Sequence, residues 1–303
     1  MKTNRVWLLL IFCNLFWAGN YVFGSYVVAE LAPLTITFYR CLFATILLIP
    51  LAYFLEKPTL QEIKAAWRSL IAMAFLGIIG YNFILYSALE YTSAMNASLV
   101  NALNPGVIVL FSFLLLKERL SRIQLSGFLL SLLGAMVVIT GGRLDLLFQL
   151  KFNIGDIYML GAVLVWTFYS LIARKAPIRP ITAICVSTFF AVMILLPIGI
   201  MEPVVLFDVS ITALTGILYM AIFPAVGSFI FWTISVREIG ASKAGITLNL
   251  IPVFTAIISI ILGHGVTASQ VIGGVLVFIG VYLTSGLLEK TISNRHEKHR
   301  LNV

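Results

Sequence analysis

The chain has 303 residues, of which 61% are hydrophobic and only 11% are charged, and its mean hydropathy is +1.06. A soluble domain carries about 25% charged residues, so the composition excludes an ordinary soluble protein and indicates a membrane protein. In a soluble protein the net charge of +8 would suggest nucleic-acid binding, but here its distribution along the chain has another meaning.

Ten apolar segments recur along the chain, and each is long enough to cross a hydrocarbon core of about 30 Å as a helix. They cover residues 6–28, 33–54, 69–89, 93–116, 122–141, 154–173, 181–201, 210–234, 241–263 and 269–288. The first segment has no cleavage site of the signal-peptide kind, so we expect it to be retained. The pattern predicts an all-α integral membrane protein with ten transmembrane helices.

Lys and Arg residues lie almost entirely on one side of this predicted topology. Seventeen fall in the N-terminus, in the loops after the second, fourth, sixth and eighth segments, and in the tail, against two, Arg143 and Lys151, on the other side. The positive-inside rule then predicts a multi-pass protein of the inner (plasma) membrane with both termini cytoplasmic. The basic charge is explained by topology, and we expect no nucleic-acid partner.

Prolines indicate an internal repeat. Three pairs are each separated by 147 residues, namely Pro33 and Pro180, Pro50 and Pro197, and Pro105 and Pro252. The predicted division is a first five-helix repeat at 1–145, a second at 146–288 and a basic cytoplasmic tail at 289–303. Because each repeat has an odd number of spans, the second enters the membrane from the opposite side. Inverted repeats of this kind are typical of secondary transporters.

The sequence offers no arrangement typical of an enzyme. The three histidines lie at loop or tail positions 264, 296 and 299, and no Asp or Glu occupies the middle of a predicted span. Cys13, Cys41 and Cys185 lie at unrelated depths within spans, without disulfide or metal-ligand spacing. We therefore expect neither enzymatic activity nor a cofactor or metal, and no buried carboxylate that could relay protons.

Neutral polar and aromatic side chains recur within the spans at helical spacing. Asn14, Trp17, Tyr21 and Ser25, for example, form one stripe of the first span. We expect such stripes to face a cavity, and the plainer spans to face lipid or to pack through glycines. The predicted substrate-binding residues are Trp17, Asn20, Tyr21, Asn82, Tyr86, Asn101, Asn104, Trp166, Tyr169, Trp232 and Asn249.

Each of these residues also has a purely structural interpretation. Buried asparagines often form hydrogen bonds between helices, and Trp and Tyr serve as core aromatics or interfacial anchors. We place Arg40 in an outer vestibule, although it could instead reach the surface or pair with a carboxylate. Pro105 and Pro252 are predicted hinges, because a proline inside a span removes a backbone hydrogen bond and kinks the helix.

Residues 88–138 contain an Ala-Leu-x-Tyr-x-Ser opening, a proline, a Glu-Arg-Leu loop, then Gln-x-x-Gly and a glycine one heptad later. These positions are Ala88, Leu89, Tyr91, Ser93, Pro105, Glu118, Arg119, Leu120, Gln124, Gly127 and Gly134. In this pattern the chain resembles the EamA-type family of the drug/metabolite transporter superfamily. The resemblance implies two inverted five-helix repeats, a central cavity and export of small metabolites. The second copy departs from it, with Gly263-His264-Gly265 in place of the loop glutamate.

We therefore expect a transporter that exports a small metabolite, such as an amino acid or a nucleobase, by alternating access, with that solute and membrane lipids as its partners. Coupling to exchange, to facilitated diffusion or to protons stays open. The alternative is a non-transporting membrane component, either a structural subunit or a lipid-modifying enzyme. Polar stripes that converge on a wet cavity would favour transport, whereas stripes consumed in dry bonds between helices would favour the alternative.

Overall fold

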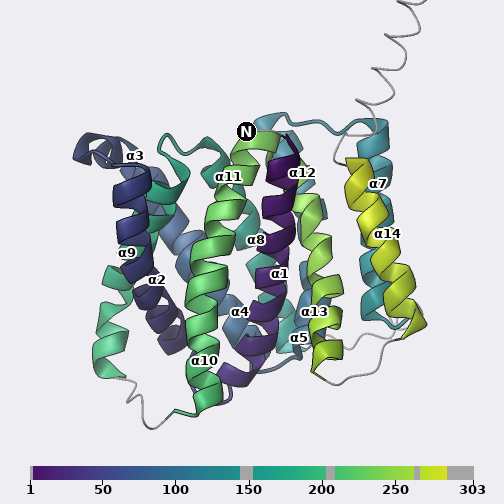
Figure 1. The fold of residues 1–303 in the computed structure, drawn as a ribbon, viewed down its shortest axis with the longest axis horizontal. Helices are drawn as coiled ribbons and strands as arrows, with labels where there is room; N and C mark the ends of the chain where they lie inside the picture. The colour runs from purple at the N-terminus through teal and green to yellow at the C-terminus, as the bar shows by residue number, and fades with distance from the viewer. Residues whose placement is uncertain (1–2, 144–152, 203–208, 263–266, 285–303) are drawn as a thin grey trace, which may run out of the picture.

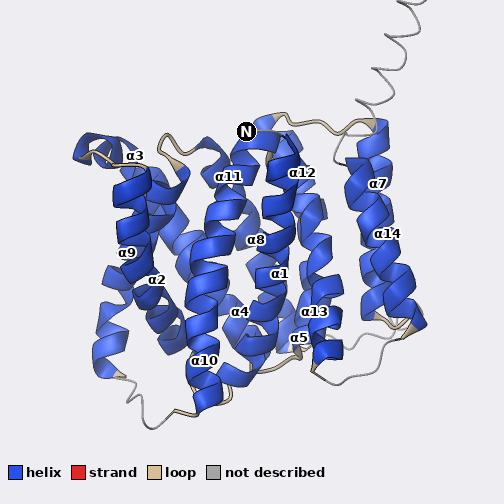
Figure 2. Cartoon of the chain, in the orientation of Figure 1, coloured by secondary structure: helices blue, strands red, loops and turns tan. Residues whose placement is uncertain are grey.

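The computed structural model of the protein describes residues 3–143, 153–202, 209–262 and 267–284, and within these ranges every regular element is a helix (Figure 2). The first half contains α1 (Thr3–Val27), α2 (Pro33–Leu55), α3 (Leu60–Met73), η1 (Ala74–Gly80), α4 (Tyr81–Leu89), α5 (Ala94–Asn101), α6 (Asn104–Phe111), η2 (Ser112–Leu116) and α7 (Arg122–Ile139). The second contains α8 (Ile154–Lys175), α9 (Pro180–Met201), α10 (Ile211–Met220), η4 (Ala221–Ser228), α11 (Phe229–Ile239), α12 (Ala241–Ile246), η5 (Thr247–Asn249), α13 (Leu250–Ile261) and α14 (Ala268–Thr284).

The predicted apolar segments are helical over their described residues, apart from a few end residues and a turn at 102–103. Among the described residues, seven helices are long and apolar enough to cross a membrane, and three further apolar helices are shorter, at Asn104–Leu116, Arg122–Val138 and Val271–Thr284. The number of ten spans therefore stays a prediction. The third helix begins at Leu60, earlier than residue 69, because the Thr59 side chain accepts from Glu62 N at 3.2 Å while Glu62 Oε2 accepts from Thr59 N at 2.8 Å.

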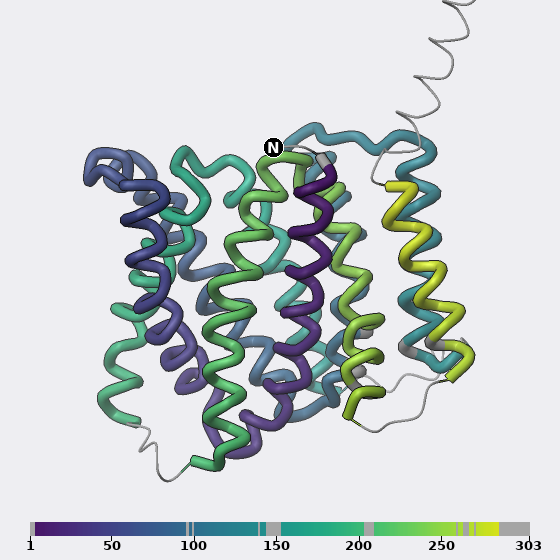
Figure 3. Tube along the Cα trace, viewed as in Figure 1, coloured from purple at the N-terminus to yellow at the C-terminus, as the bar shows by residue number. Residues whose placement is uncertain are grey.

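The helices form one bundle in which partners far apart in sequence lie side by side (Figure 1). α2 packs against α9 on one side of the bundle, and α7 packs against α14 on the other. Between these pairs, α1 packs against α10, η4, α11 and α13, and α4 packs against α8. The tube in Figure 3 shows that the chain alternates between the end that carries the N-terminus, drawn at the top and called the upper end, and the opposite lower end.

The α2–α9 pair is held by reciprocal contacts at its two ends. Glu56, just after α2, accepts from Thr182 N and from its hydroxyl, both at 2.7 Å, near the start of α9. Glu202, just after α9, accepts from the Thr35 hydroxyl at 2.5 Å, near the start of α2. Each carboxylate therefore lies at the positive end of the partner helix, where unpaired N–H groups favour negative charge, and Glu56 caps that end directly.

Irregular turns occur at matching places in the two halves. The π-helical segments η1 and η4 begin at Ala74 and Ala221, which are 147 residues apart. The α-helix is also interrupted shortly before Pro105, between α5 and α6, and shortly before Pro252, where η5 separates α12 from α13. A proline fits the first turn of a helix because the N–H it lacks has no partner there. The two predicted hinge residues thus follow breaks in their helices.

Glycines form the contact between α7 and α14. A Cβ on Gly134 would lie 2.6 Å from the Gly273 carbonyl oxygen, and one on Gly280 would lie 2.5 Å from the Gly127 carbonyl oxygen. The two backbones therefore touch at both points, so the glycines pack in the way expected from the sequence. Such close approach maximises van der Waals contact, which drives helix association where lipid is as apolar as the side chains.

Contacts between the two halves also close both ends of the bundle. At the upper end Glu118 lies 3.4 Å from Arg174 Nε and accepts from Ala241 N at 3.3 Å and Ser242 N at 3.0 Å. A second pair at this end, Arg179 and Glu62, is largely exposed. At the lower end, the chain after α1 meets the start of α10 through a glutamate and a serine, Glu30 and Ser210.

We predict that Gly134→Ala lowers the stability of the detergent-solubilised protein by about 1–3 kcal/mol, because a methyl group there forces α7 from α14. The control is Gly161→Ala on α8, where a Cβ meets nothing within 4 Å. That change gains up to about 1 kcal/mol in helix propensity. Thermal unfolding measures both, and equal melting temperatures for the two variants would contradict close packing of α7 on α14.

We also predict an acid-sensitive contact at the lower end. Hydrogen bonds from the Ser210 hydroxyl at 2.5 Å and its backbone N at 2.9 Å lower the pKa of the Glu30 carboxyl. A group with a lowered folded pKa stabilises the protein above its unfolded pKa, and the contribution is lost as the pH falls through the folded pKa. When the pH is lowered below about 4, the melting temperature should therefore decrease. Ser210→Ala should make that decrease smaller. An unchanged acid dependence in Ser210→Ala argues against this linkage.

Candidate functional site

Arg40, on α2, joins three helices in the interior of the bundle. Its side chain is 1% exposed, and its Nη1 donates to Asn20 Oδ1 at 3.4 Å, to Asn82 Oδ1 at 2.5 Å and to the Tyr86 hydroxyl. The Tyr86 hydroxyl in turn donates to Asn20 at 3.1 Å. The sequence placed Arg40 in an outer vestibule, with snorkelling as an alternative. The guanidinium lies inside the protein, where it bonds neutral acceptors on α1 and α4, so it does not reach the surface. Its place in an outer vestibule stays a prediction.

A second group of polar side chains links α1, α4, α5 and α6. The hydroxyls of Tyr21 and Tyr81 are 3.0 Å apart, and the Tyr81 hydroxyl lies 3.5 Å from Asn101 Oδ1. Asn104 Nδ2 donates to the same Asn101 oxygen at 3.2 Å. All four side chains are buried. The two asparagines therefore lie together in the structure, across the turn that separates α5 from α6.

Aromatic rings from both halves meet beside these polar groups. The Trp17 ring lies 5.0 Å from the Trp166 ring and 5.5 Å from the Trp232 ring, measured between centroids. Trp166 also contacts Tyr169 and Tyr81, each at 4.9 Å. Tyr81 thus connects the rings to the polar group, so the structure brings these predicted site residues into one region.

We call this region the central site, and its members come from α1, α2, α4, α5, α6, α8 and α11. They are Trp17, Asn20, Tyr21, Arg40, Tyr81, Asn82, Tyr86, Asn101, Asn104, Trp166, Tyr169 and Trp232. Several of their buried polar atoms have no hydrogen-bond partner among the described residues. These atoms are Arg40 Nε, Asn101 Nδ2, Asn104 Oδ1 and Trp166 Nε1. Because buried polar groups are normally paired, four such atoms in one region suit a ligand-binding site.

Asn249 lies apart from the central site. Its Nδ2 donates to the Ser131 hydroxyl on α7 at 2.9 Å, so its role in substrate binding stays a prediction. Tyr81, in contrast, was missed by the sequence analysis. It falls outside the stripe formed by Asn82 and Tyr86, and no local signal reports its contact with Trp166, which is 85 residues away.

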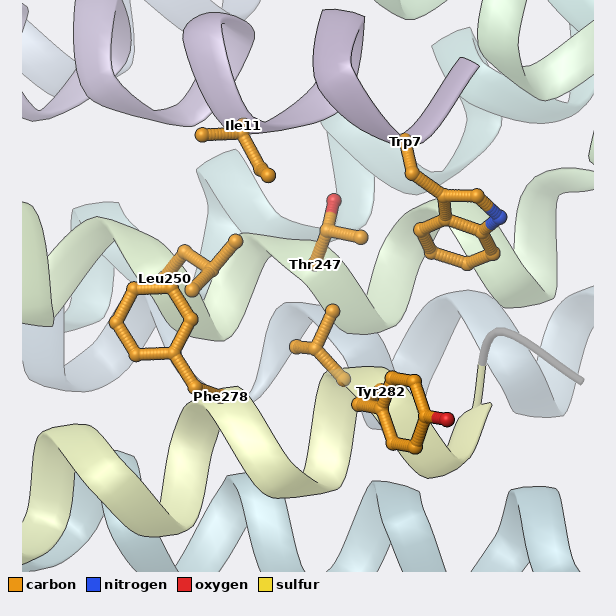
Figure 4. Close-up of a pocket in the computed structure, with 7 residues that line it drawn as sticks. Trp7, Ile11, Thr247, Leu250, Phe278 and Tyr282 are labelled. Atoms are coloured by element: carbon orange, nitrogen blue, oxygen red, sulfur yellow. The ribbon is translucent and has the colours of Figure 1, made fainter. Parts of the chain in front are cut away.

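A groove on the side of the bundle has a different character (Figure 4). It runs between α1 and α14 over η5 and α13, and its volume is about 180 Å³. Trp7, Ile11, Thr247, Leu250, Phe278, Val281 and Tyr282 line it. The Thr247 hydroxyl is engaged, because it donates to Ala244 O at 2.7 Å and accepts from Asn14 at 3.0 Å. The groove therefore offers apolar surface and lacks the converging polar atoms of the central site.

The described residues contain no group of three or more His, Cys, Asp or Glu that could hold a metal ion. Cys13, Cys41 and Cys185 are all buried free cysteines that form no disulfide. The prediction that the protein is not an enzyme agrees with the names of its relatives, which are transporters.

Comparison with known proteins identifies relatives along the whole chain. The chain is 27% identical over 303 residues to the "Uncharacterized transporter YyaM" of Bacillus subtilis (strain 168), covering 98% of this chain and 99% of that protein. An uncharacterized transporter of Archaeoglobus fulgidus is 28% identical over 292 residues, covering 93% and 98%. A solved crystal structure with 20% sequence identity matches with a TM-score of 0.74, over 95% of this chain and 99% of that one, which supports the fold.

A model of the EamA-like transporter family matches twice, at residues 5–140 and 153–286. Together with the apolar helices, this match identifies a multi-pass membrane protein of the transporter class. The chain therefore belongs to the EamA-like transporter family, as its resemblance in sequence indicated.

Proposed function

We propose that this protein moves a small metabolite across the plasma membrane by alternating access around the central site, in the direction of export. The observation that carries the proposal is the convergence of polar and aromatic side chains from both halves on one buried region. Asn101 and Asn104 each leave one polar atom unpaired there. Buried atoms without a partner also occur outside the central site, so it is their gathering beside aromatic rings from both halves that favours transport over a structural subunit or a lipid-modifying enzyme.

Two inverted repeats of five spans each, at 1–145 and 146–288, are the architecture that we infer for this cycle. Four observations support them: the two matches to the family model, the π-helical segments 147 residues apart, the reciprocal capping of α2 and α9, and the glycine contacts of α7 with α14. A two-fold axis in the membrane plane makes contacts reciprocal in this way. The tail at 289–303 lies outside the described residues.

Alternating access needs a contact that opens at each end of the bundle. At the upper end, which the positive-inside rule assigns to the cytoplasm, Glu118 of the first half holds Arg174 and the start of α12 in the second. At the lower end Glu30 holds Ser210. Pro105 and Pro252 are the proposed hinges, because the helix breaks beside them let one part of each span move relative to the other.

The central site suits a small polar or amphipathic solute. Amide and phenol groups offer both donors and acceptors, and the tryptophan rings offer flat apolar surface for a solute's body. Amino acids, nucleobases and similar metabolites have this chemistry. Uptake and release of labelled amino acids and nucleobases in liposomes, with and without a pH gradient, test the proposal and its coupling. Failure of every solute to move would refute it.

The asparagines of the central site give a sharper prediction. Asn101→Ala should reduce transport at least about tenfold while lowering stability by only about 1–3 kcal/mol, the cost of leaving Tyr81 and Asn104 without the Asn101 oxygen that accepts from them. The control is Ser187→Ala on α9, whose buried hydroxyl donates to Leu70 O at 2.9 Å in a bond between helices. That variant should lose stability and keep transport. Equal losses of folded protein and activity in Asn101→Ala would favour a structural role.

The upper contact predicts a shift in accessibility. Glu118→Gln removes the charge that binds Arg174, so the upper end should open more often. A cysteine introduced at position 101 should then react faster with a membrane-impermeant maleimide added from that side. Glu62→Gln is the matched control, because the Arg179–Glu62 pair at the same end is about half exposed and contributes little. If both variants label at the same rate, Glu118 does not hold this end closed.

A further inference from the structure

Arg40 places a positive charge where the described residues supply no negative one. Its side chain is 1% exposed, and the groups that it contacts, Asn20, Asn82 and Tyr86, are neutral amides and a phenol. Among the described residues Arg40 forms no ion pair. Arginine keeps its proton in proteins, and a buried charge in a membrane protein is costly unless it is paired or serves a pathway.

The Nε–Nη2 edge of the Arg40 guanidinium forms no hydrogen bond with the described residues. All hydrogen bonds from Arg40 to described residues come from Nη1, and the buried Nε has no partner. Asn82 is fixed in its orientation, because its Nδ2 donates to Gly77 O at 3.1 Å and to Ile78 O at 2.8 Å, so that its oxygen faces Arg40. Neighbouring side chains therefore steady Nη1, while the Nε–Nη2 edge is the planar fork that matches a carboxylate with two parallel hydrogen bonds.

The charge also belongs to one half only. The position 147 residues after Arg40 is Ser187, whose hydroxyl is engaged with Leu70 O between α9 and α3. A structural requirement of the shared architecture would be met in both halves. A single cation beside a cluster formed by both halves is instead what recognition of an asymmetric solute needs.

We infer that the counter-charge of Arg40 is the carboxylate of the transported solute. The solute class is then a small monocarboxylate, with the carboxylate on the Nε–Nη2 edge of Arg40 and an apolar or planar body toward Trp17 and Trp166. Asn20 supports this placement, since it contacts Arg40 and lies one helical turn from Trp17 on α1. This inference rests on the proposed transport function and narrows its substrates to carboxylates, excluding nucleobases and simple amines.

The test uses solute pairs of equal shape that differ in the carboxylate. Benzoate and benzamide, L-phenylalanine and L-phenylalaninamide, and L-leucine and L-leucinamide are titrated into the purified full-length protein in nanodiscs. Binding is followed by thermal shift and by tryptophan fluorescence. Transport of the same compounds is measured in liposomes. At least one carboxylate should bind about tenfold or more tightly than its amide partner, and only the carboxylate should be moved.

Two variants locate the effect at Arg40. Asn82→Asp supplies a carboxylate within reach of Nη1, so it should keep the fold and abolish the preference for carboxylates. Arg40→Lys keeps the charge and loses the planar fork, so it should weaken carboxylate binding while retaining part of the preference. Ser187→Ala, outside the central site, should leave the preference unchanged. Size-exclusion profiles and melting curves confirm that each variant is folded.

The outcomes separate this inference from the proposed function. If the amides bind and move as well as their carboxylate partners, or if Asn82→Asp keeps the preference, the role of Arg40 is refuted while transport stands. If no solute of either kind binds or moves, the proposed function and this inference fail together. A carboxylate preference that disappears in Asn82→Asp supports both.

Discussion

In the hydrocarbon interior of a membrane, every polar group must find its partner within the protein. This constraint explains why the described residues form helices throughout, since a helix satisfies its own backbone. It also gives meaning to the polar side chains that remain. Glu56 and Glu202 cap the starts of neighbouring helices, and Ser187 bonds a backbone carbonyl of α3. Twelve buried side-chain polar atoms of the described residues lack a partner, and four of them, on Arg40, Asn101, Asn104 and Trp166, lie together in the central site.

The bundle combines rigid and adjustable parts. α7 and α14 touch backbone to backbone through glycines, and α2 and α9 hold each other at both ends. Between these two pairs lie the helices that are interrupted beside Pro105 and Pro252 and those that carry π-helical turns. Such interruptions free backbone groups and weaken a helix locally, and they often occur at functional sites. The central site lies among these adjustable elements, held between the two close-packed pairs.

The two halves share an architecture and differ in chemistry. Three proline pairs and the π-helical segments η1 and η4 recur at a spacing of 147 residues, whereas Arg40, Asn101 and Asn104 correspond to Ser187, Leu248 and Ile251. In the proposed transport cycle, duplicated elements supply the frame and its movement, and residues of one half supply most of the polar recognition. The stretch that contains Asn101, Asn104 and Pro105 joins both roles, because the asparagines flank the helix break.

Composition and periodicity alone determined the membrane class and the positions of the apolar helices, because burial in lipid and helical spacing are local properties of a sequence. The spacing of the prolines predicted the repeat, and helical spacing predicted most of the residues that the structure brings together in the central site, whose role in binding stays a proposal. Tertiary structure decided the rest. The Arg40 side chain is buried because acceptors on α1 and α4 lie within its reach. Tyr81 belongs to the central site through its contact with Trp166, whereas Asn249 bonds Ser131 on α7. These outcomes depend on which helices become neighbours, and contacts between residues far apart in the chain leave no periodic trace in the sequence.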